Sequence, residues 1–135
     1  MWPFLDTAPS FVQFAMLVLC VPMGLSHIVR PGMWVDFFTR VHAQGTAGLV
    51  GKVLAVELWP ATLIVTLHQV WWGPGIVLTL YGWAMLAKVL LALLAPQIGM
   101  RSLAMAHTKG ERGFVLGGVM LVIVGFSAGA ALIWG

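Results

Sequence analysis

Residues 31–50 of this chain, PGMWVDFFTRVHAQGTAGLV, decide its fold, because their pattern occurs a second time 65 residues further on (31 to 96, for example). The shared positions are Pro31, His42, Gly45, Gly48 and Val50, which recur as Pro96, His107, Gly110, Gly113 and Val115. Each copy has an apolar span, a proline, a polar connector with a histidine and two glycines, and a second apolar span. The sequence therefore predicts two tandem, parallel helix hairpins, about 9–70 and 74–135, in one membrane domain covering residues 1–135.

The composition is that of a membrane protein. Apolar residues make up 61% of the chain, charged residues 8%, and the mean hydropathy is +1.00, whereas soluble domains are about 25% charged. Apolar spans occur at about 10–30, 46–69, 74–95 and 113–134. About 20 residues at 1.5 Å each cross a hydrocarbon core of about 30 Å. We therefore predict an all-α fold with four transmembrane helices.

The lysines and arginines between the spans predict how the chain is oriented. They occur in two connectors, as Arg30 and Arg40 in the first and as Arg101, Lys109 and Arg112 in the second. The N-terminal tail, the 70–73 turn and the C-terminus contain none. Because Lys- and Arg-rich short loops stay in the cytoplasm, we expect a multi-pass protein of a bacterial inner (cytoplasmic) membrane with both termini outside.

The first connector carries an apolar stripe. Trp34, Phe37, Phe38 and Val41 follow one another at i, i+3, i+4 and i+7, which places them on one face of a helix. This spacing predicts an amphipathic helix between the first and second spans. We expect it to lie in the membrane interface with the stripe as its anchor, because aromatic side chains suit the headgroup region. The alternative is that this helix binds a partner.

Two further patterns predict how the spanning helices pack and bend. Small residues allow helix backbones to approach closely in lipid, and they form stripes on the second span (Gly48, Gly51, Ala55, Thr62) and on the fourth (Gly118, Gly125, Gly129). Pro60 interrupts the second span. Because proline has no N–H to donate to the carbonyl of Val56, a kink is expected there.

Two charged residues lie deep in the predicted spans. Glu57 is about 14–18 Å and Lys88 about 12 Å from the cytoplasmic side, at 1.5 Å per residue. A charge in the hydrocarbon costs about 2.5–3.5 kcal/mol on insertion scales, so we predict an ion pair between Glu57 and Lys88. This pair would fix helix register, line a proton or ion path, or meet a subunit or lipid headgroup.

Other polar residues in the spans have simpler explanations. Lys52 is close enough to the membrane surface to extend its ammonium to the cytoplasmic headgroups. His27 is near the end of the first span, where a backbone or lipid partner is available, and His68 is at the opposite end of the second. Ligation of haem or a pigment by His68 is a minor alternative. No cofactor and no metal site are predicted, although bound lipid is expected.

Several short motifs bear a resemblance to known proteins. They are Pro31-Gly-Met-Trp34, His68-Gln-Val-Trp71, Leu78-Thr-Leu-Tyr-Gly-Trp83, and Lys88 followed by Leu90-Leu91 and Pro96. Together, over roughly residues 20–96, the chain resembles small bacterial four-helix integral membrane proteins of unassigned function, although Lys88 is followed here by Val89 where such proteins often have glycine. The resemblance implies topology and no activity, cofactor or substrate.

Two classes of function are expected. The first is a non-catalytic accessory, structural or assembly subunit of a larger membrane complex. The alternative is a small homo-oligomeric carrier or channel that uses Glu57 and Lys88. An enzyme is not expected, because the chain has no His-Glu-x-x-His motif and no paired carboxylates. Expected partners are membrane lipids and other membrane subunits or further copies of this chain. Nucleic acid is not expected, because no cluster of lysines and arginines alternates with aromatic residues.

Overall fold

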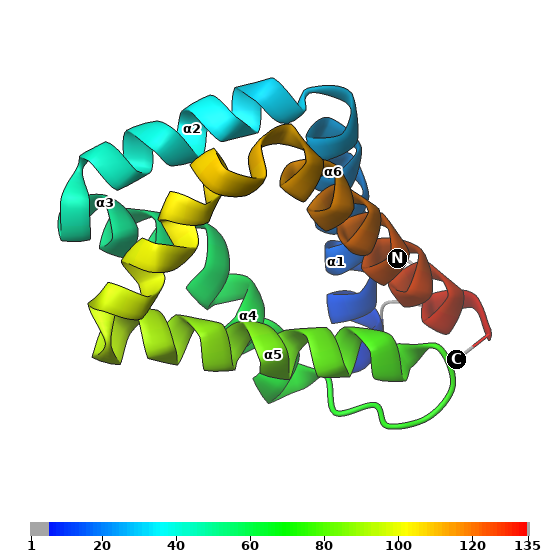
Figure 1. Cartoon of the computed structure of the whole chain (residues 1–135). Helices are drawn as coiled ribbons and strands as arrows, with labels where there is room; N and C mark the ends of the chain where they lie inside the picture. The colour runs from blue at the N-terminus through cyan, green and yellow to red at the C-terminus, as the bar shows by residue number, and fades with distance from the viewer. Residues whose placement is uncertain (1–5, 135) are drawn as a thin grey trace.

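The computed structural model describes residues 6–134, apart from the side chain of His107, and all of its regular elements are helical (Figure 1). In chain order they are α1 (Ala8–Val29), α2 (Pro31–Ala43), α3 (Gly45–Lys52), the π-helical turn η2 (Val53–Leu58), α4 (Trp59–Leu67), α5 (Gly75–Leu94) and α6 (Pro96–Trp134). No strand occurs within residues 6–134.

Four helical stretches are long and apolar enough to cross a membrane. They are Ala8–Val29, Gly45–Leu67, Gly75–Leu94 and Thr108–Trp134. The second stretch joins α3, η2 and α4 into one continuous helix, and the fourth is the later part of α6. The four predicted spans are confirmed, and their length and composition indicate a multi-pass membrane protein.

The two long connectors, one between the first and second stretches and one between the third and fourth, are helical. They begin and end alike. Pro31 starts α2 and Pro96 starts α6, which suits proline because the first helical N–H has no partner within the helix. Gly45 ends the first connector with φ 69°, and Gly110 breaks α6 with φ 58° and ψ −146°. Only glycine adopts these angles readily. α6 is therefore two helices, 96–109 and 111–134, that meet at Gly110.

The spanning helices pack as two pairs. α1 lies along the second part of α6, on the right of Figure 1, and α4 lies against α5 at the bottom. α2 also contacts α6 and so bridges between the pairs at the connector end. The pairs meet directly through the core residues Val12, Met16, Cys20, Ile64, Leu78, Val124 and Ala128. A second core joins α2, α3, η2, α5 and α6 through Val41, Leu49, Val53, Val89, Ala92 and Leu103.

Small residues make one of these pairs especially close. A Cβ atom on Gly118 would lie 2.6 Å from the carbonyl oxygen of Gly24, and the reverse holds for a Cβ on Gly24. The small stripe of the fourth span therefore packs against the first span. Of the small stripe predicted for the second span, only Gly48 packs closely, since a Cβ there would clash with the carbonyl oxygen of Val41. Gly51 has open space beside it, and Ala55 and Thr62 are exposed.

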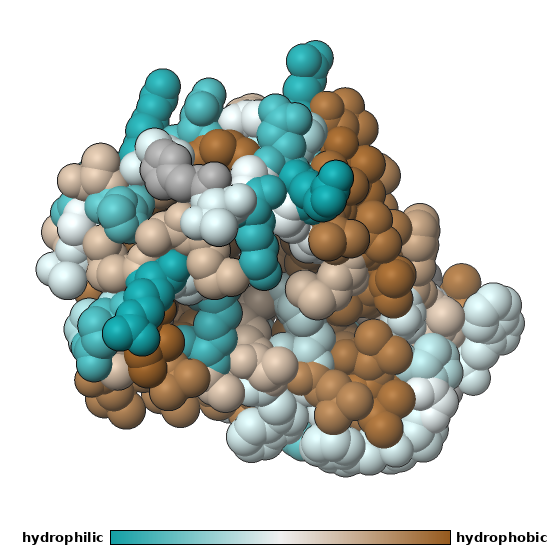
Figure 2. Space-filling view, in the orientation of Figure 1, coloured by the Kyte–Doolittle hydropathy of each residue, from teal (hydrophilic) through white to brown (hydrophobic). Residues whose placement is uncertain are grey.

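The outside of the molecule suits lipid. Figure 2 shows hydrophobic side chains over the right side, where Figure 1 places α6, and most of the hydrophilic ones towards the top and left. Leu94, Ile133 and Trp134 are each more than 70% exposed. Apolar side chains exposed to this extent are usual where helices meet lipid tails and unusual on soluble proteins.

Candidate functional site

The structure brings the two deep charges together. The ammonium nitrogen of Lys88 lies 3.2 Å from Oε1 of Glu57, so that η2 and α5 are joined as the sequence predicts. Glu57 is buried, with a side chain only 9% exposed, while the side chain of Lys88 is 54% exposed.

Lys52 joins the same carboxylate, which the sequence does not predict. Its ammonium nitrogen lies 2.8 Å from Oε1 of Glu57, and its side chain is only 4% exposed. Lys52 therefore does not extend to the membrane surface. The ammonium also lies 4.9 Å from the centre of the Phe38 ring, close enough for a cation–π attraction.

The π-helical turn explains this contact. Residues five apart are about 140° apart around an α-helix, so Lys52 and Glu57 would point in different directions on a regular second span. In η2 the backbone repeat is i to i+5, and Glu57 comes next to Lys52. Pro60 lies two residues beyond η2 and has no N–H that could continue this repeat to the carbonyl of Ala55. The indole nitrogen of Trp59 donates instead to the carbonyl of Ala55, at 2.8 Å.

One oxygen of the carboxylate has no hydrogen-bond partner among the described residues. Both lysines contact Oε1, while Oε2 of Glu57 is buried and accepts no hydrogen bond from any described residue. A buried acceptor without a hydrogen bond lowers the stability of the fold by about 1–3 kcal/mol, and by more when it is charged. The cluster of Lys52, Glu57 and Lys88 therefore has an unused acceptor and a formal charge of +1, from two lysines and one carboxylate.

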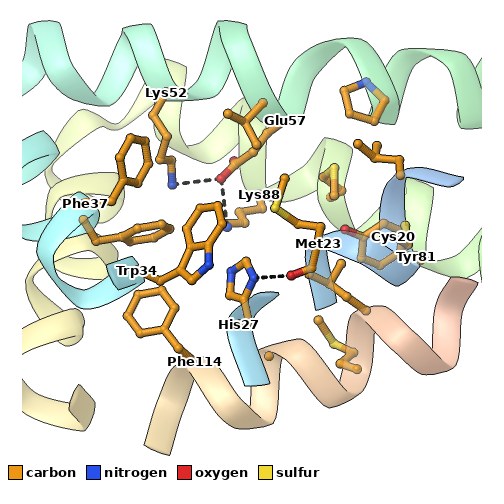
Figure 3. Close-up of a pocket in the computed structure, with 18 of the residues that line it drawn as sticks. Cys20, Met23, His27, Trp34, Phe37, Lys52, Glu57, Tyr81, Lys88 and Phe114 are labelled. Carbon is orange, nitrogen blue, oxygen red and sulfur yellow. Dashed lines mark hydrogen bonds and ion pairs between the residues drawn. The ribbon is translucent and has the colours of Figure 1, made fainter. Parts of the chain in front are cut away.

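A cavity of about 710 Å³ adjoins this charge cluster (Figure 3). Lys52, Glu57 and Lys88 line it together with mostly apolar and aromatic side chains from α1, α2, α5 and α6. α5 contributes a stripe at i, i+3, i+4 and i+7, namely Tyr81, Ala84, Met85 and Lys88. Of the seven methionines among the described residues, five line the cavity, at positions 16, 23, 33, 85 and 120.

The aromatic stripe of α2 faces this cavity. Trp34 stacks on His27 with ring centres 4.2 Å apart and planes 13° apart, and its indole donates to Ser26 Oγ at 2.9 Å. His27 Nδ1–H donates to the carbonyl of Met23 at 2.7 Å. Figure 3 shows the Trp34–His27 stack below Lys52 and Glu57.

The rest of the stripe also lies against the protein. Phe37 and Phe38 line the cavity, Phe38 contacts Phe114 at 4.9 Å between ring centres, and Val41 is buried in the second core. The stripe is thus directed at other parts of the chain, and an anchoring role of α2 in the membrane interface stays a prediction.

A second cavity of about 480 Å³ lies beside the first. It is lined by α3, η2, α5 and the first part of α6, and its walls include Leu49, Ala92 and Ser102. The two cavities share Lys52, Glu57, Ala84 and Lys88. The charge cluster therefore lies between the two cavities and is a wall of both.

His68 belongs to a separate polar network, just beyond the end of α4. Gln13 Nε2 lies 3.0 Å from His68 Nε2, and His68 Nδ1 lies 3.0 Å from Thr79 Oγ1. Thr79 in turn donates to the carbonyl of Val70 at 2.6 Å. Donors and acceptors match when the amide of Gln13 donates to a neutral histidine whose proton is on Nδ1. His68 is fully buried, and this burial lowers the pKa of its imidazole.

The hydrogen bonds of His68 oppose the alternative in which this histidine binds haem or a pigment. Both ring nitrogens of His68 are in hydrogen bonds with Gln13 and Thr79, so axial ligation would require one of these bonds to break. Among the described residues, no three His, Cys, Asp or Glu side chains are grouped closely enough to hold a metal ion.

The sequence indicates only part of this site. It points to Glu57, Lys88 and the stripe of α2, and it misses the contact of Lys52, the cavity, and Tyr81. The available signal for Tyr81 is its position seven residues, or two helical turns, before Lys88.

Comparisons of the chain with protein-family models, curated proteins and solved structures found no match.

Proposed function

We propose that this protein binds a lipophilic molecule from the bilayer in the cavity between its helix pairs. The polar end of the molecule lies at Glu57 and the lysines, and its apolar part lies among the methionines and aromatic rings. The role is binding without catalysis, and an accessory, structural or assembly subunit of a larger membrane complex stays a prediction beside it.

The volume of the cavity and the side chains that line it are the main support for this proposal. Small-molecule sites are mostly apolar cavities of about 300–1,000 Å³ with a few convergent polar groups, and the volume of about 710 Å³ lies within that range. Methionine is flexible and common at surfaces that adapt to apolar ligands. The five methionines at the cavity therefore favour a ligand site over a merely imperfect core.

The unpaired oxygen of Glu57 supports binding over a purely structural ion pair. A buried pair stabilises a fold only when its remaining lone pairs are also hydrogen-bonded, and Oε2 has no such bond to the described residues. Ionisable groups within membrane helices that are kept despite their cost mark functional sites by default. The polar end of a ligand can instead meet the ammonium of Lys88, whose side chain lines the cavity and is 54% exposed.

The remaining features of the proposal concern topology and partners. We infer that the chain arose by duplication of one hairpin, because the breaks at Gly45 and Gly110 and the starts at Pro31 and Pro96 recur at the same spacing. We further propose an inner-membrane location with both termini outside and α2 near the interface. The proposed partners are membrane lipids, further copies of this chain and other membrane subunits, and the exposed apolar faces suit all three.

Two glycines provide a matched test of cavity binding. A Cβ on Gly117 or on Gly51 meets nothing within 4 Å, but only Gly117 lines the cavity. We expect native mass spectrometry of protein released gently from membranes to find a lipophilic adduct on the wild type and on Gly51→Leu, and to find it reduced at least about tenfold on Gly117→Leu. Equal adducts on all three proteins would contradict the proposal.

A carrier or channel is the second candidate, favoured by one observation. The charge cluster is a wall of both cavities, so a proton or ion could reach Glu57 or its lysines from either cavity. Proton flux into liposomes containing the purified protein, abolished by Glu57→Gln and retained in Gly51→Leu, would support it. If the Glu57→Gln variant gives the same proton flux as the wild type, or if the wild type gives none, the charge cluster does not conduct protons.

A further inference from the structure

We propose that the ligand is a neutral lipid whose polar end is a flat ring with two carbonyl groups on opposite sides, which is the chemistry of a para-quinone. This inference rests on the proposed binding function and names the class of ligand. The ring lies beside α5, between Tyr81 and Lys88, and the alkyl chain lies along the apolar walls of the larger cavity.

Tyr81 supplies a hydroxyl that the fold itself does not use. Its side chain is half-buried, packs against the first core and lines the larger cavity. The hydroxyl makes no hydrogen bond with a described residue, and its oxygen retains accessible surface, unlike Oε2 of Glu57. Buried tyrosines usually find a hydrogen-bond partner, and lipid tails offer none. A ligand in the cavity can therefore accept a hydrogen bond from Tyr81.

Lys88 supplies a second accessible donor. Its side chain lines the cavity and is 54% exposed, and its ammonium makes one described contact, with Oε1 of Glu57 at 3.2 Å. An ammonium has three N–H groups and no acceptor, so the ligand has to bring the acceptor. Tyr81 and Lys88 lie on one face of α5, about 10 Å apart along the helix axis. Because Lys88 is held at Glu57, a small head group meets both donors only if it has acceptors at opposite ends.

The walls of the cavity favour a flat ring at this place. Ala84 lies between the two donors on the same face of α5 and lines the cavity, and its small side chain leaves room for a ring. In the view of Figure 3, the side chain of Met23 lies between Tyr81 and Lys88. Thioether sulfur and aromatic side chains both make favourable contacts with flat ring systems. Both kinds of side chain line the cavity, and they include Met23, Met85, Trp34, Phe37, Phe38 and Phe114.

The charges around Lys88 favour a neutral ligand. The ammoniums of Lys52 and Lys88 repel a cation, and an anion at Lys88 would also approach the carboxylate of Glu57, whose Oε1 is 3.2 Å from that ammonium. A carbonyl oxygen accepts from an ammonium without adding a charge to the membrane interior. A quinone thus combines two opposed acceptors, a flat ring and no charge.

Three probes test the class of ligand on the full-length protein in neutral detergent. The first is a para-benzoquinone with three methyl groups and a decyl chain, whose ring has no free position at which a lysine can add. The second is the same ring with C–H in place of both carbonyls, and the third is decanoate. We expect native mass spectrometry to show the quinone bound at least about tenfold more tightly than either other probe, because two hydrogen bonds, one from a charged donor, together contribute at least about one factor of ten.

Variants of the two donors test where the carbonyls bind. Tyr81→Phe removes only the hydroxyl, so affinity for the quinone should fall about three- to tenfold while affinity for the hydrocarbon stays within about twofold. Lys88→Met should lower affinity for the quinone at least about tenfold. Trp83→Phe is the matched control, because Trp83 is on α5 and lines neither cavity, and it should leave both affinities unchanged.

Infrared spectroscopy provides a readout that a merely structural effect of these variants would not move. Hydrogen bonding lowers the stretching frequency of a carbonyl, so the bound quinone should show carbonyl bands below those of the quinone in detergent alone. Tyr81→Phe and Lys88→Met should each return one band towards its position in detergent.

The outcomes separate the two proposals. Equal affinity for the quinone and the hydrocarbon, or binding of decanoate as tight as that of the quinone, overturns the quinone inference and leaves cavity binding in place. A quinone affinity and carbonyl bands that Tyr81→Phe leaves unchanged overturn it in the same way. If no probe binds although gently released wild-type protein carries a lipophilic adduct, only the quinone inference is wrong. If no probe binds and no such adduct is found, the proposed function itself is wrong.

Discussion

The ammonium of Lys52 lies 2.8 Å from Oε1 of Glu57, five residues further along the chain. Residues at this spacing meet only because the backbone between them is π-helical. The conformation of η2 and the charge cluster therefore depend on each other. A change that restores a regular α-helix here would turn the carboxylate away from Lys52.

The two lysines should contribute unequally to the cluster. Lys52 is the more buried and the closer to Glu57, so its coupling with Glu57 is less screened. Double-mutant cycles combining Glu57→Gln with Lys52→Met or Lys88→Met, read from unfolding in increasing dodecyl sulfate, should give a larger interaction for Lys52, about 1–3 kcal/mol. A larger interaction for Lys88 would contradict this ranking.

The indole of Trp59 should stabilise the π-helical turn. Trp59→Phe removes the donor to the carbonyl of Ala55 and should lower the free energy of unfolding by about 0.5–1.5 kcal/mol. Trp83 is a matched control, because it is 44% exposed against 45% for Trp59 and its indole has no hydrogen bond to a described residue. Equal effects of Trp59→Phe and Trp83→Phe would show that the hydrogen bond contributes nothing.

Adjacent glycines in α6 should differ sharply in their tolerance of a methyl group. Gly118→Ala places a Cβ 2.6 Å from the carbonyl of Gly24 and should destabilise the α1–α6 pair by about 1–3 kcal/mol. Gly117→Ala meets open space and should be neutral or stabilising by up to about 1 kcal/mol, since alanine favours the helix. Thermal unfolding in detergent would measure both, and the reverse order would contradict the packing of this pair.

The buried His68 should make stability depend on pH. Burial lowers the pKa of His68 in the folded protein below its usual value of 6.5, so the unfolded state binds the proton more readily. Stability is therefore fully present above about pH 6.5 and falls as the pH drops below it, by at most about 1.4 kcal/mol per pH unit. His68→Gln should remove this part of the slope in unfolding measurements between about pH 7 and pH 5, whereas an unchanged slope would exclude His68 as its cause.

The sequence predicts the helices far better than the site. Hydropathy and length locate the four spans, and depth alone pairs Glu57 with Lys88, because helices of similar length bring residues of equal depth together. Lys52 is missed because periodicity assumes 3.6 residues per turn, and the π-helical turn departs from it. The cavity is missed because it arises from the divergence of two helix pairs, which no local pattern encodes. Trp34 shows a similar limit: its stripe is readable, but whether lipid or the protein faces it is not.

Photolabelling is the most direct test of binding in the cavity. A single-chain lipid with a diazirine in its chain would be irradiated with the protein, and the labelled residues would be mapped by mass spectrometry. Labels on cavity residues such as Phe37 and Met85, lost when an excess of the same lipid without the diazirine is added, are the predicted result. Labels confined to outward-facing residues such as Leu94, which is 82% exposed, and unaffected by the competitor would contradict binding in the cavity.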